Sequence, residues 1–262
     1  MLLQEMQLKC INGHSYDLSR EGYVNLVGHA VKTHYNKQLF TSRKSITQKG
    51  FFKPLRDFLV HEISLRKNSS ENLSILDAGC GEGSLFSQVL EMLRGKYTEL
   101  NAIGADLAKE GIKLAGRDHP EVLWMVANLA DLPLTDNKVD VILNLLAPAS
   151  YYQFCRVLSP RGILIKVIPG KEYLKELRDL YSIGRSRHDE TVPMAISLFE
   201  KQFRYVENKR IMRTISVERE IARDLTEMTP LLWNLKDKKE KILELKKVTL
   251  DLHVLISSMD RQ

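Results

Sequence analysis

The sequence predicts an α/β fold with a mostly parallel sheet, and two observations carry this prediction. Short apolar runs alternate with amphipathic stretches from residue 74 to residue 168. The first apolar run ends in three glycines at every second position, Gly79, Gly81 and Gly83. Strands that alternate with helices imply right-handed crossovers and a parallel sheet. Ligands then collect at the carboxyl ends of the strands.

The periodicity places the predicted elements in order along the chain. Residues 53–66 carry apolar side chains at helical spacing, which indicates an amphipathic helix leading into the sheet. The predicted strands are 74–78, 100–105, 122–126, 139–145, 162–168 and 248–256, with further strand material at 203–207 and 210–217. The predicted helices are 82–94, 108–117 and 149–158, followed by a largely helical insert at 170–201. We expect a seven-stranded sheet.

The stretch at 75–83, Ile-Leu-Asp-Ala-Gly-Cys-Gly-Glu-Gly, predicts a turn that binds S-adenosylmethionine (SAM). Glycines let the chain turn tightly and leave no Cβ between backbone and ligand. A nicotinamide-binding loop needs G-x-G-x-x-G, but its third glycine would fall at Ser84. SAM has no phosphate, and an acid can help to hold its cationic methionine end. The predicted cofactor contacts in this turn are Asp77, Gly79, Cys80, Gly81, Glu82 and Gly83.

Polar residues also follow three later strands. Asp106, with Leu107 beside it, is placed to accept hydrogen bonds from both ribose hydroxyls. Asn128, followed by Leu129, ends the next strand with an amide that could pair with adenine. Asn144 begins the loop expected to face the methyl group, where it could bind the base or the cofactor or only shape the pocket.

The sequence identifies no catalytic residue. The loop at 144–148 contains no acid. Three residues of the insert, His188, Asp189 and Glu190, are acid/base candidates, but each could equally be a surface residue. A base is needed if the methylated nitrogen carries a proton. We therefore assign no general base.

Composition limits the function classes. The chain has 262 residues, a formal net charge of +6 and a pI near 9.1, which permits a polyanionic partner without requiring one. Cys10, Cys80 and Cys155 are scattered, and their odd number argues against a disulfide framework. No apolar run approaches the roughly 20 residues that span a bilayer, and no apolar signal-peptide core follows the first residues. We expect a cytoplasmic protein that does not enter a membrane.

The chain divides into a predicted N-terminal RNA-recognition element at 1–50 and a methyltransferase domain at 51–262. Cys10 and His14 have the spacing of half a zinc site, but tetrahedral zinc needs four ligands and no Cys-x-x-Cys accompanies them. We therefore predict no metal site. The stretch at 32–50 could lie on a phosphate backbone and stack a base, or be a solvated linker. Its basic residues are Lys32, His34, Lys37, Arg43, Lys44 and Lys49, and Tyr35 and Phe40 lie between them.

Three segments carry a resemblance to a known family. They are Glu21-Gly-Tyr-Val-Asn-Leu26, Leu76-Asp-Ala-Gly-Cys-Gly-Glu-Gly83 and Met228-Thr-Pro-Leu-Leu-Trp233. In order and separation they resemble the bacterial 23S rRNA (guanine-N1) methyltransferases. The resemblance implies a Rossmann-like class I SAM methyltransferase that acts on N1 of a guanine in a 23S rRNA hairpin loop. It also implies a homodimer whose N-terminal parts bind zinc and help to frame a cleft for the RNA.

The resemblance places cofactor contacts at Gly81 and Glu82, and also at Phe52 and Tyr173, where family members carry tyrosine and histidine. The sequence departs from the family pattern at the zinc site, of which only Cys10 and His14 remain. Either the first cysteine pair was lost with an upstream segment or the element folds without metal. Two other function classes stay open: a SAM-dependent small-molecule methyltransferase, and a ribosome-binding protein with a residual SAM pocket.

Overall fold

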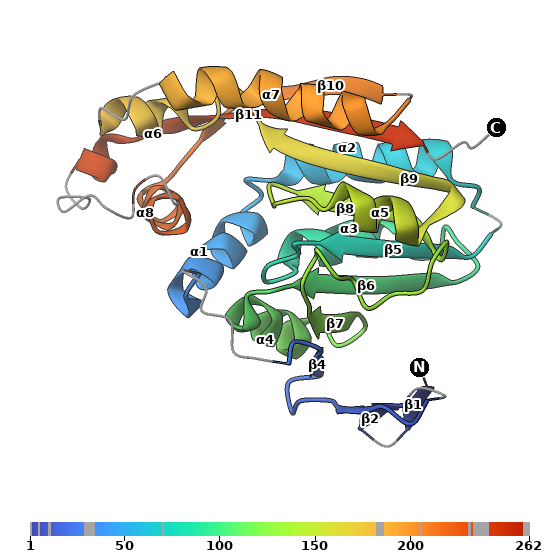
Figure 1. Ribbon diagram of the computed structural model, residues 1–262. Helices are drawn as coiled ribbons and strands as arrows, with labels where there is room; N and C mark the ends of the chain where they lie inside the picture. The colour runs from blue at the N-terminus through green and yellow to red at the C-terminus, as the bar shows by residue number, and fades with distance from the viewer. Residues whose placement is uncertain are drawn as a thin grey trace.

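The central sheet of the computed structural model has eight strands in the order β10-β11-β9-β8-β5-β6-β7-β4 (Figure 1). The structure describes residues 2–4, 6–9, 12–28, 35–69, 71–181, 186–204, 206–229, 232 and 241–258. The strands are β4 (Tyr23–Asn25), β5 (Leu73–Ala78), β6 (Leu100–Asp106), β7 (Leu123–Val126), β8 (Val139–Leu145), β9 (Leu158–Pro169), β10 (Val206–Ser216) and β11 (Lys247–Ser258). The run from β4 to β9 is parallel, whereas β11 pairs antiparallel with both β9 and β10.

Helices cover both faces of this sheet. The helices are α1 (Lys37–Gln48), α2 (Lys53–Arg66), α3 (Ser84–Leu93), α4 (Lys109–Asp118), α5 (Tyr151–Val157), α6 (Lys175–Leu180), α7 (Ser186–Gln202) and α8 (Arg219–Met228), and a short 3₁₀ helix spans Lys241–Glu244. Successive residues of β5 point to opposite faces. Accordingly, Ile75 packs in one core cluster with Phe86, and Leu76 packs in another with Phe154. Burial on both faces explains why β5 reads as a continuous apolar run.

The predicted α/β alternation is confirmed, and the observed strand and helix ends lie close to the predicted ones. In place of the two predicted strand pieces at 203–207 and 210–217, one continuous strand, β10, spans Val206–Ser216. The predicted count of seven strands was too low by one. The additional strand is β4, in which Tyr23 lies in parallel register with Trp124 of β7. The Glu21–Leu26 motif therefore extends the edge of the main sheet.

The N-terminal part of the chain contributes to two structures. β1 (Leu2–Gln4), β2 (Gln7–Lys9) and β3 (Ser15–Asp17) form a separate antiparallel sheet. In contrast, α1 packs against α8, α4 and α3 of the main body. Figure 1 shows α1 and α8 together beyond the carboxyl ends of the parallel strands, where ligands of such sheets bind. Within the described ranges, no helix is long and apolar enough to cross a membrane.

Candidate active site

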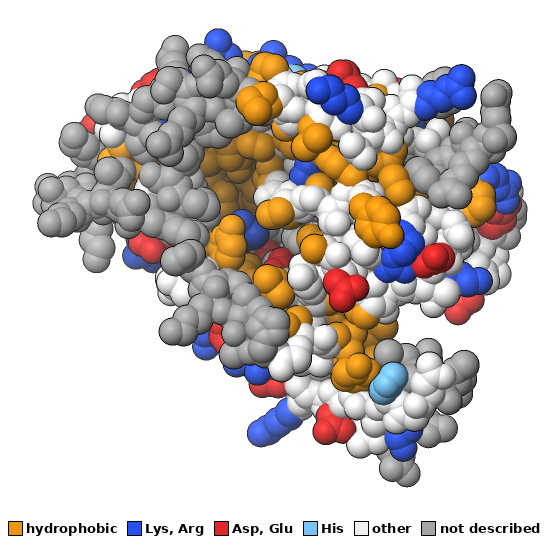
Figure 2. All heavy atoms as spheres, in the orientation of Figure 1, with side chains coloured by type: hydrophobic (Ala, Val, Ile, Leu, Met, Phe, Trp, Pro, Cys, Tyr) orange, Lys and Arg blue, Asp and Glu red, His pale blue; other side chains and the backbone are white. Residues whose placement is uncertain are grey.

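Two adjoining cavities lie at the carboxyl ends of the parallel strands. One has a volume of about 290 Å³ and the other about 250 Å³. Both are lined by Tyr35, Arg43, Gly79 and Leu146, so they meet beside the glycine turn. We call the larger one the Asp77 cavity and the smaller one the Asp106 cavity, after the acid that lines each. Figure 2 shows a hollow on this face of the molecule with hydrophobic side chains along its walls.

The glycine turn needs its glycines for backbone and packing reasons as well as for ligand access. Gly79 and Gly83 have φ values of 89° and 76°, which L side chains rarely adopt. A Cβ on Gly79 would lie 2.4 Å from the Ala147 Cβ, and one on Gly83 would lie 2.4 Å from Cη2 of Trp124. Of the three predicted glycine contacts, only Gly79 lines the cavities. Gly81 and Gly83 belong to the turn but line neither cavity.

Asp106, the last residue of β6, is held in place by two backbone hydrogen bonds. Its Oδ2 accepts a hydrogen bond from Gly81 N at 2.9 Å, and its Oδ1 accepts one from Ala108 N at 2.7 Å. Burial raises the pKa of this carboxyl, while the backbone donors of Ala108 and Gly81 act in the opposite direction. A carboxylate oxygen has two lone pairs. Each oxygen can therefore also accept from a ribose hydroxyl, as predicted for this residue.

The residues predicted to contact adenine line the same cavity. Leu107, Asn128 and Leu129 line the Asp106 cavity together with Pro148. The Asn128 side chain is exposed, and its Oδ1 accepts a hydrogen bond from Ala130 N at 3.0 Å. This bond orients the amide, and its nitrogen is then the group that can donate to an adenine ring.

Asp77 and Glu82 are buried acids that line the other cavity. Each is 3% exposed, and Asp77 Oδ1 and Glu82 Oε2 have no hydrogen-bond partner within the described part of the chain. Burial raises the pKa of Asp77 well above its usual range and that of Glu82 to about 7, and nearby Arg43 opposes both shifts. Buried polar atoms are normally hydrogen-bonded. Two orphaned acid oxygens beside a cavity therefore fit a ligand with positive charge.

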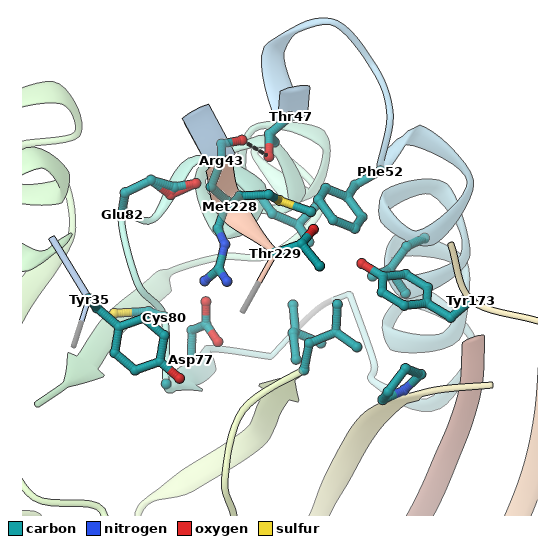
Figure 3. Close-up of a pocket in the computed structure, with 16 residues that line it drawn as sticks. Tyr35, Arg43, Thr47, Phe52, Asp77, Cys80, Glu82, Tyr173, Met228 and Thr229 are labelled. Atoms are coloured by element: carbon teal, nitrogen blue, oxygen red, sulfur yellow. Dashed lines mark hydrogen bonds between the residues drawn. The ribbon is translucent and has the colours of Figure 1, made fainter. Parts of the chain in front are cut away.

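The remaining walls of the Asp77 cavity come from distant parts of the chain. Phe52 precedes α2, Tyr173 follows β9, and both line the cavity as the resemblance implied. Figure 3 shows both rings on the right side of the view, with Met228 and Thr229 to the left of Phe52. Thr229 belongs to the third motif segment, of which Pro230, Leu231 and Trp233 lie outside the described residues. Burial raises the pKa of Tyr173 to about 12, so its hydroxyl stays protonated at neutral pH.

The structure gives Asn144 a different position from the predicted contact. Its side chain is fully buried and lies outside both cavity linings. Its Nδ2 donates to Ala78 O at 2.6 Å and Pro148 O at 2.9 Å, and its Oδ1 accepts from Lys166 Nζ at 2.6 Å. Asn144 therefore ties the loop at 145–148 to the glycine turn. That loop contains Leu146, whose φ of 54° places it in the left-handed region.

The sequence did not identify Arg43 as a residue of the site. It grouped Arg43 with the basic stretch at 32–50, but the structure directs this side chain from α1 into both cavities. Lys32 and His34 of the same stretch lie outside the described residues. Nothing in the local pattern separates Arg43 from Lys44, because both lie on the same helix with similar neighbours.

The predicted zinc half-site and the acid/base candidates fall partly outside the described chain. Cys10 is one of the undescribed residues, and the side chains of His188, Asp189 and Glu190 are also not described. Among the side chains that are described, no three of His, Cys, Asp or Glu come together as metal ligands.

Comparisons with known proteins agree with this geometry. Residues 75–162 match a family model described as "Methyltransferase domain", and residues 1–33 match the zinc-ribbon model described as "RlmA, N-terminal". The "Putative 23S rRNA (guanine-N(1)-)-methyltransferase YxjB" of Bacillus subtilis is 36% identical over 250 residues, which cover 93% of this chain and 88% of the relative. The "23S rRNA (guanine(748)-N(1))-methyltransferase" of Streptomyces fradiae is 28% identical, over 87% of this chain and 80% of the relative.

A solved structure supports the fold. The crystal structure of a SAM-dependent methyltransferase from Aquifex aeolicus superposes with a TM-score of 0.51 at 14% identity, covering 86% of this chain and 99% of that one. At this identity, the likeness concerns the fold alone. The predicted Rossmann-like class I methyltransferase fold is therefore confirmed. The sequence relatives show to which family of methyltransferases the chain belongs. The chain belongs to the family of 23S rRNA (guanine-N1) methyltransferases.

Proposed function

We propose that this protein transfers a methyl group from SAM to N1 of a guanine in a hairpin loop of 23S rRNA. The observation that carries the proposal is the pair of cavities that meet at Gly79, one lined by Asp106 and the other by two orphaned acids. The guanine of 23S rRNA as substrate follows from family membership, because the relatives' names specify both the RNA and the atom.

The described residues fit SAM in a defined direction. The ribose and adenine would lie in the Asp106 cavity, against Asp106, Leu107, Asn128 and Leu129. The methionine end would cross Gly79 into the Asp77 cavity, where Asp77 and Glu82 face its positive charges. Phe52 and Tyr173 would then border the methyl group and the incoming base.

SAM supplies a methyl group on a positively charged sulfur. In the reaction a bond forms between guanine N1 and the methyl carbon, the bond from that carbon to sulfur breaks with its electron pair left on sulfur, and the N1 proton passes to water. The protein's main task is alignment, since in-line displacement needs the reacting atoms about 3–3.5 Å apart. The loop at 145–148, held by Asn144, sets one wall of this arrangement. The apolar side chains of Leu145, Pro169 and Met228 line the space for a flat base.

We further propose that the N-terminal part of the chain includes an RNA-recognition element and that the protein works as a cytoplasmic homodimer. The predicted boundary between residues 1–50 and 51–262 is not kept, because β4 pairs with β7 of the main sheet and α1 packs against α8. The first proposal is supported by the match of residues 1–33 to the RlmA N-terminal model. The homodimer follows from the family resemblance. Light scattering of the purified protein tests it, because a mass of about 60 kDa is expected against 30.1 kDa for one chain.

The function is tested by methyl transfer. Purified protein and labelled SAM are incubated with unmethylated 23S rRNA, and the modified nucleotide is mapped by mass spectrometry. One methyl group at N1 of a guanine is expected. Transfer only to small molecules would favour the small-molecule methyltransferase. Tight SAM binding without any transfer would favour the non-catalytic ribosome-binding protein.

A further inference from the structure

Arg43 is a cation surrounded by buried acids. It lines both cavities and lies where they meet. Its positive charge lowers the pKa of Asp77, Glu82 and Asp106, against the effect of burial on each. Figure 3 shows its guanidinium pointing into the cavity toward Asp77, with Glu82 to one side. Even so, within the described part of the chain the guanidinium makes no hydrogen bond and no ion pair.

The helix that carries Arg43 is held in place by its other polar residues. Asn36 caps α1 by accepting a hydrogen bond from Leu39 N at 2.9 Å. Ser42 donates to Asp224 at 3.0 Å, and Lys44 forms an ion pair with Asp118 at 2.7 Å. The residues on either side of Arg43 are therefore bound to neighbouring elements. Arg43 differs from them because its side chain enters a cavity, where its guanidinium donors can bind a ligand.

The charges around the Asp77 cavity match the methionine end of SAM. That end carries a sulfonium and an ammonium, both positive, and one carboxylate. The cavity offers two buried acids with orphaned oxygens, Asp77 and Glu82, and one guanidinium without a direct partner in the described chain, Arg43. A guanidinium presents a planar fork of donors that suits a carboxylate. The acids alone would account for the positive groups but would repel the carboxylate.

We propose that Arg43 binds the carboxylate of the methionine end and so makes the site select adenosine ligands that carry a complete amino acid. Arg43 would act as a positioning residue, because it fixes the far end of SAM while the methyl group faces the base. This inference rests on the proposed function, since it names one contact of the proposed SAM site.

The test compares two ligands that differ only in the proposed contact. SAM and decarboxylated SAM share the adenosine, sulfonium and ammonium groups, but the second lacks the carboxylate. Isothermal titration calorimetry gives both affinities for the wild-type protein, for Arg43→Gln and for the control Lys37→Gln. Lys37 is an exposed lysine of α1 that lines neither cavity. We expect Arg43→Gln to weaken SAM at least tenfold and to leave decarboxylated SAM within about threefold, as befits a lost charged hydrogen bond.

Other outcomes would overturn the inference. Equal losses for both ligands would show that Arg43 only offsets the charge of the buried acids. An unchanged SAM affinity would show that the carboxylate binds elsewhere. If Arg43→Gln does not fold, Arg43→Lys keeps the charge but lacks the fork, and a loss specific to SAM is still expected. Wild-type protein that binds no SAM would instead refute the proposed function.

Discussion

At the scale of single residues, the site depends on acids that the fold buries without satisfying. An orphaned buried acid oxygen is unfavourable in the free protein. Burial raises the pKa of both Asp77 and Glu82. The pKa of Glu82 reaches about 7, so its neutral form is accessible near neutral pH and the cost is reduced there. A cationic ligand reverses this preference. Binding and ionisation are therefore expected to be linked.

Glu82 makes the linkage measurable, because its pKa is raised to about 7. SAM is expected to bind more tightly as pH rises from 6 to 8 and to release protons at pH 6.5. Calorimetry in two buffers of different ionisation enthalpy measures this release, which should fall in Glu82→Gln. The free energy of unfolding of the ligand-free protein depends on pH in the opposite direction. The stabilisation that comes from the raised pKa of Glu82 is fully present below about pH 4.5 and is lost as pH rises through about 7. SAM binding without proton release at pH 6.5 would contradict the prediction.

Asp106 gives a second residue-scale prediction. Asp106→Ala should weaken SAM binding at least tenfold, because the loss of hydrogen bonds to a charged group costs about 1.5–3 kcal/mol. The control is Asp131→Ala, which removes an exposed acid that lines neither cavity. Titration calorimetry compares the two. An affinity equal to that of the wild type would remove Asp106 from the site.

At the scale of elements, the turn between β5 and α3 combines backbone strain and close packing. Gly83 has φ 76° and faces Trp124, whereas Gly95 has a similar φ of 74° and no heavy atom within 4 Å of the point where a Cβ would lie. Gly83→Ala should therefore lower the free energy of unfolding more than Gly95→Ala, by about 1–3 kcal/mol for the overpacking alone. Urea unfolding measures both. Equal losses would mean that only the backbone conformation matters.

The loop at 145–148 is held by hydrogen bonds from Lys166, and this support can be tested. Lys166 is buried, its pKa is lowered by burial to about 8, and its Nζ donates to Asn144 Oδ1 and Ala147 O. Lys166→Met leaves Asn144 Oδ1 buried without this donor and should lower the free energy of unfolding by about 1–3 kcal/mol. SAM binding should weaken as well, since the loop lines both cavities.

The matched control for this loop is Lys138→Met, which changes an exposed lysine. Its stability and SAM affinity should equal those of the wild type. If Lys166→Met also behaves like the wild type, the loop at 145–148 keeps its conformation without Lys166, and the proposed support by Lys166 would be refuted.

At the scale of the whole molecule, the net charge of +6 predicts different salt responses for the two proposed substrates. Binding of a 23S rRNA hairpin should weaken about tenfold or more from 50 to 200 mM salt, as expected for about three contacts with phosphates. SAM binding should change much less, because buried charges are screened less than exposed ones. Filter binding and calorimetry measure the two. Equal salt dependence would argue against an RNA substrate.

Local sequence pattern was enough to predict the fold class, the strand and helix alternation and the positions of Asp77, Asp106 and Asn128 at strand ends. These follow from local pattern, because the period of apolar residues fixes which face of an element is buried. The carboxyl end of each parallel strand then identifies one edge of the sheet.

Contacts between distant parts of the chain were needed to identify the other residues of the site. These contacts place β4 on the sheet edge and direct Arg43, rather than Lys44, into the cavities. They also bond the Asn144 side chain to Pro148 and Lys166. These features depend on long-range packing: α1, for example, is positioned against α8, which lies far later in the chain. A local pattern cannot specify such a contact, because the residues that pack against α1, and so determine which of its side chains face the cavities, are remote in sequence.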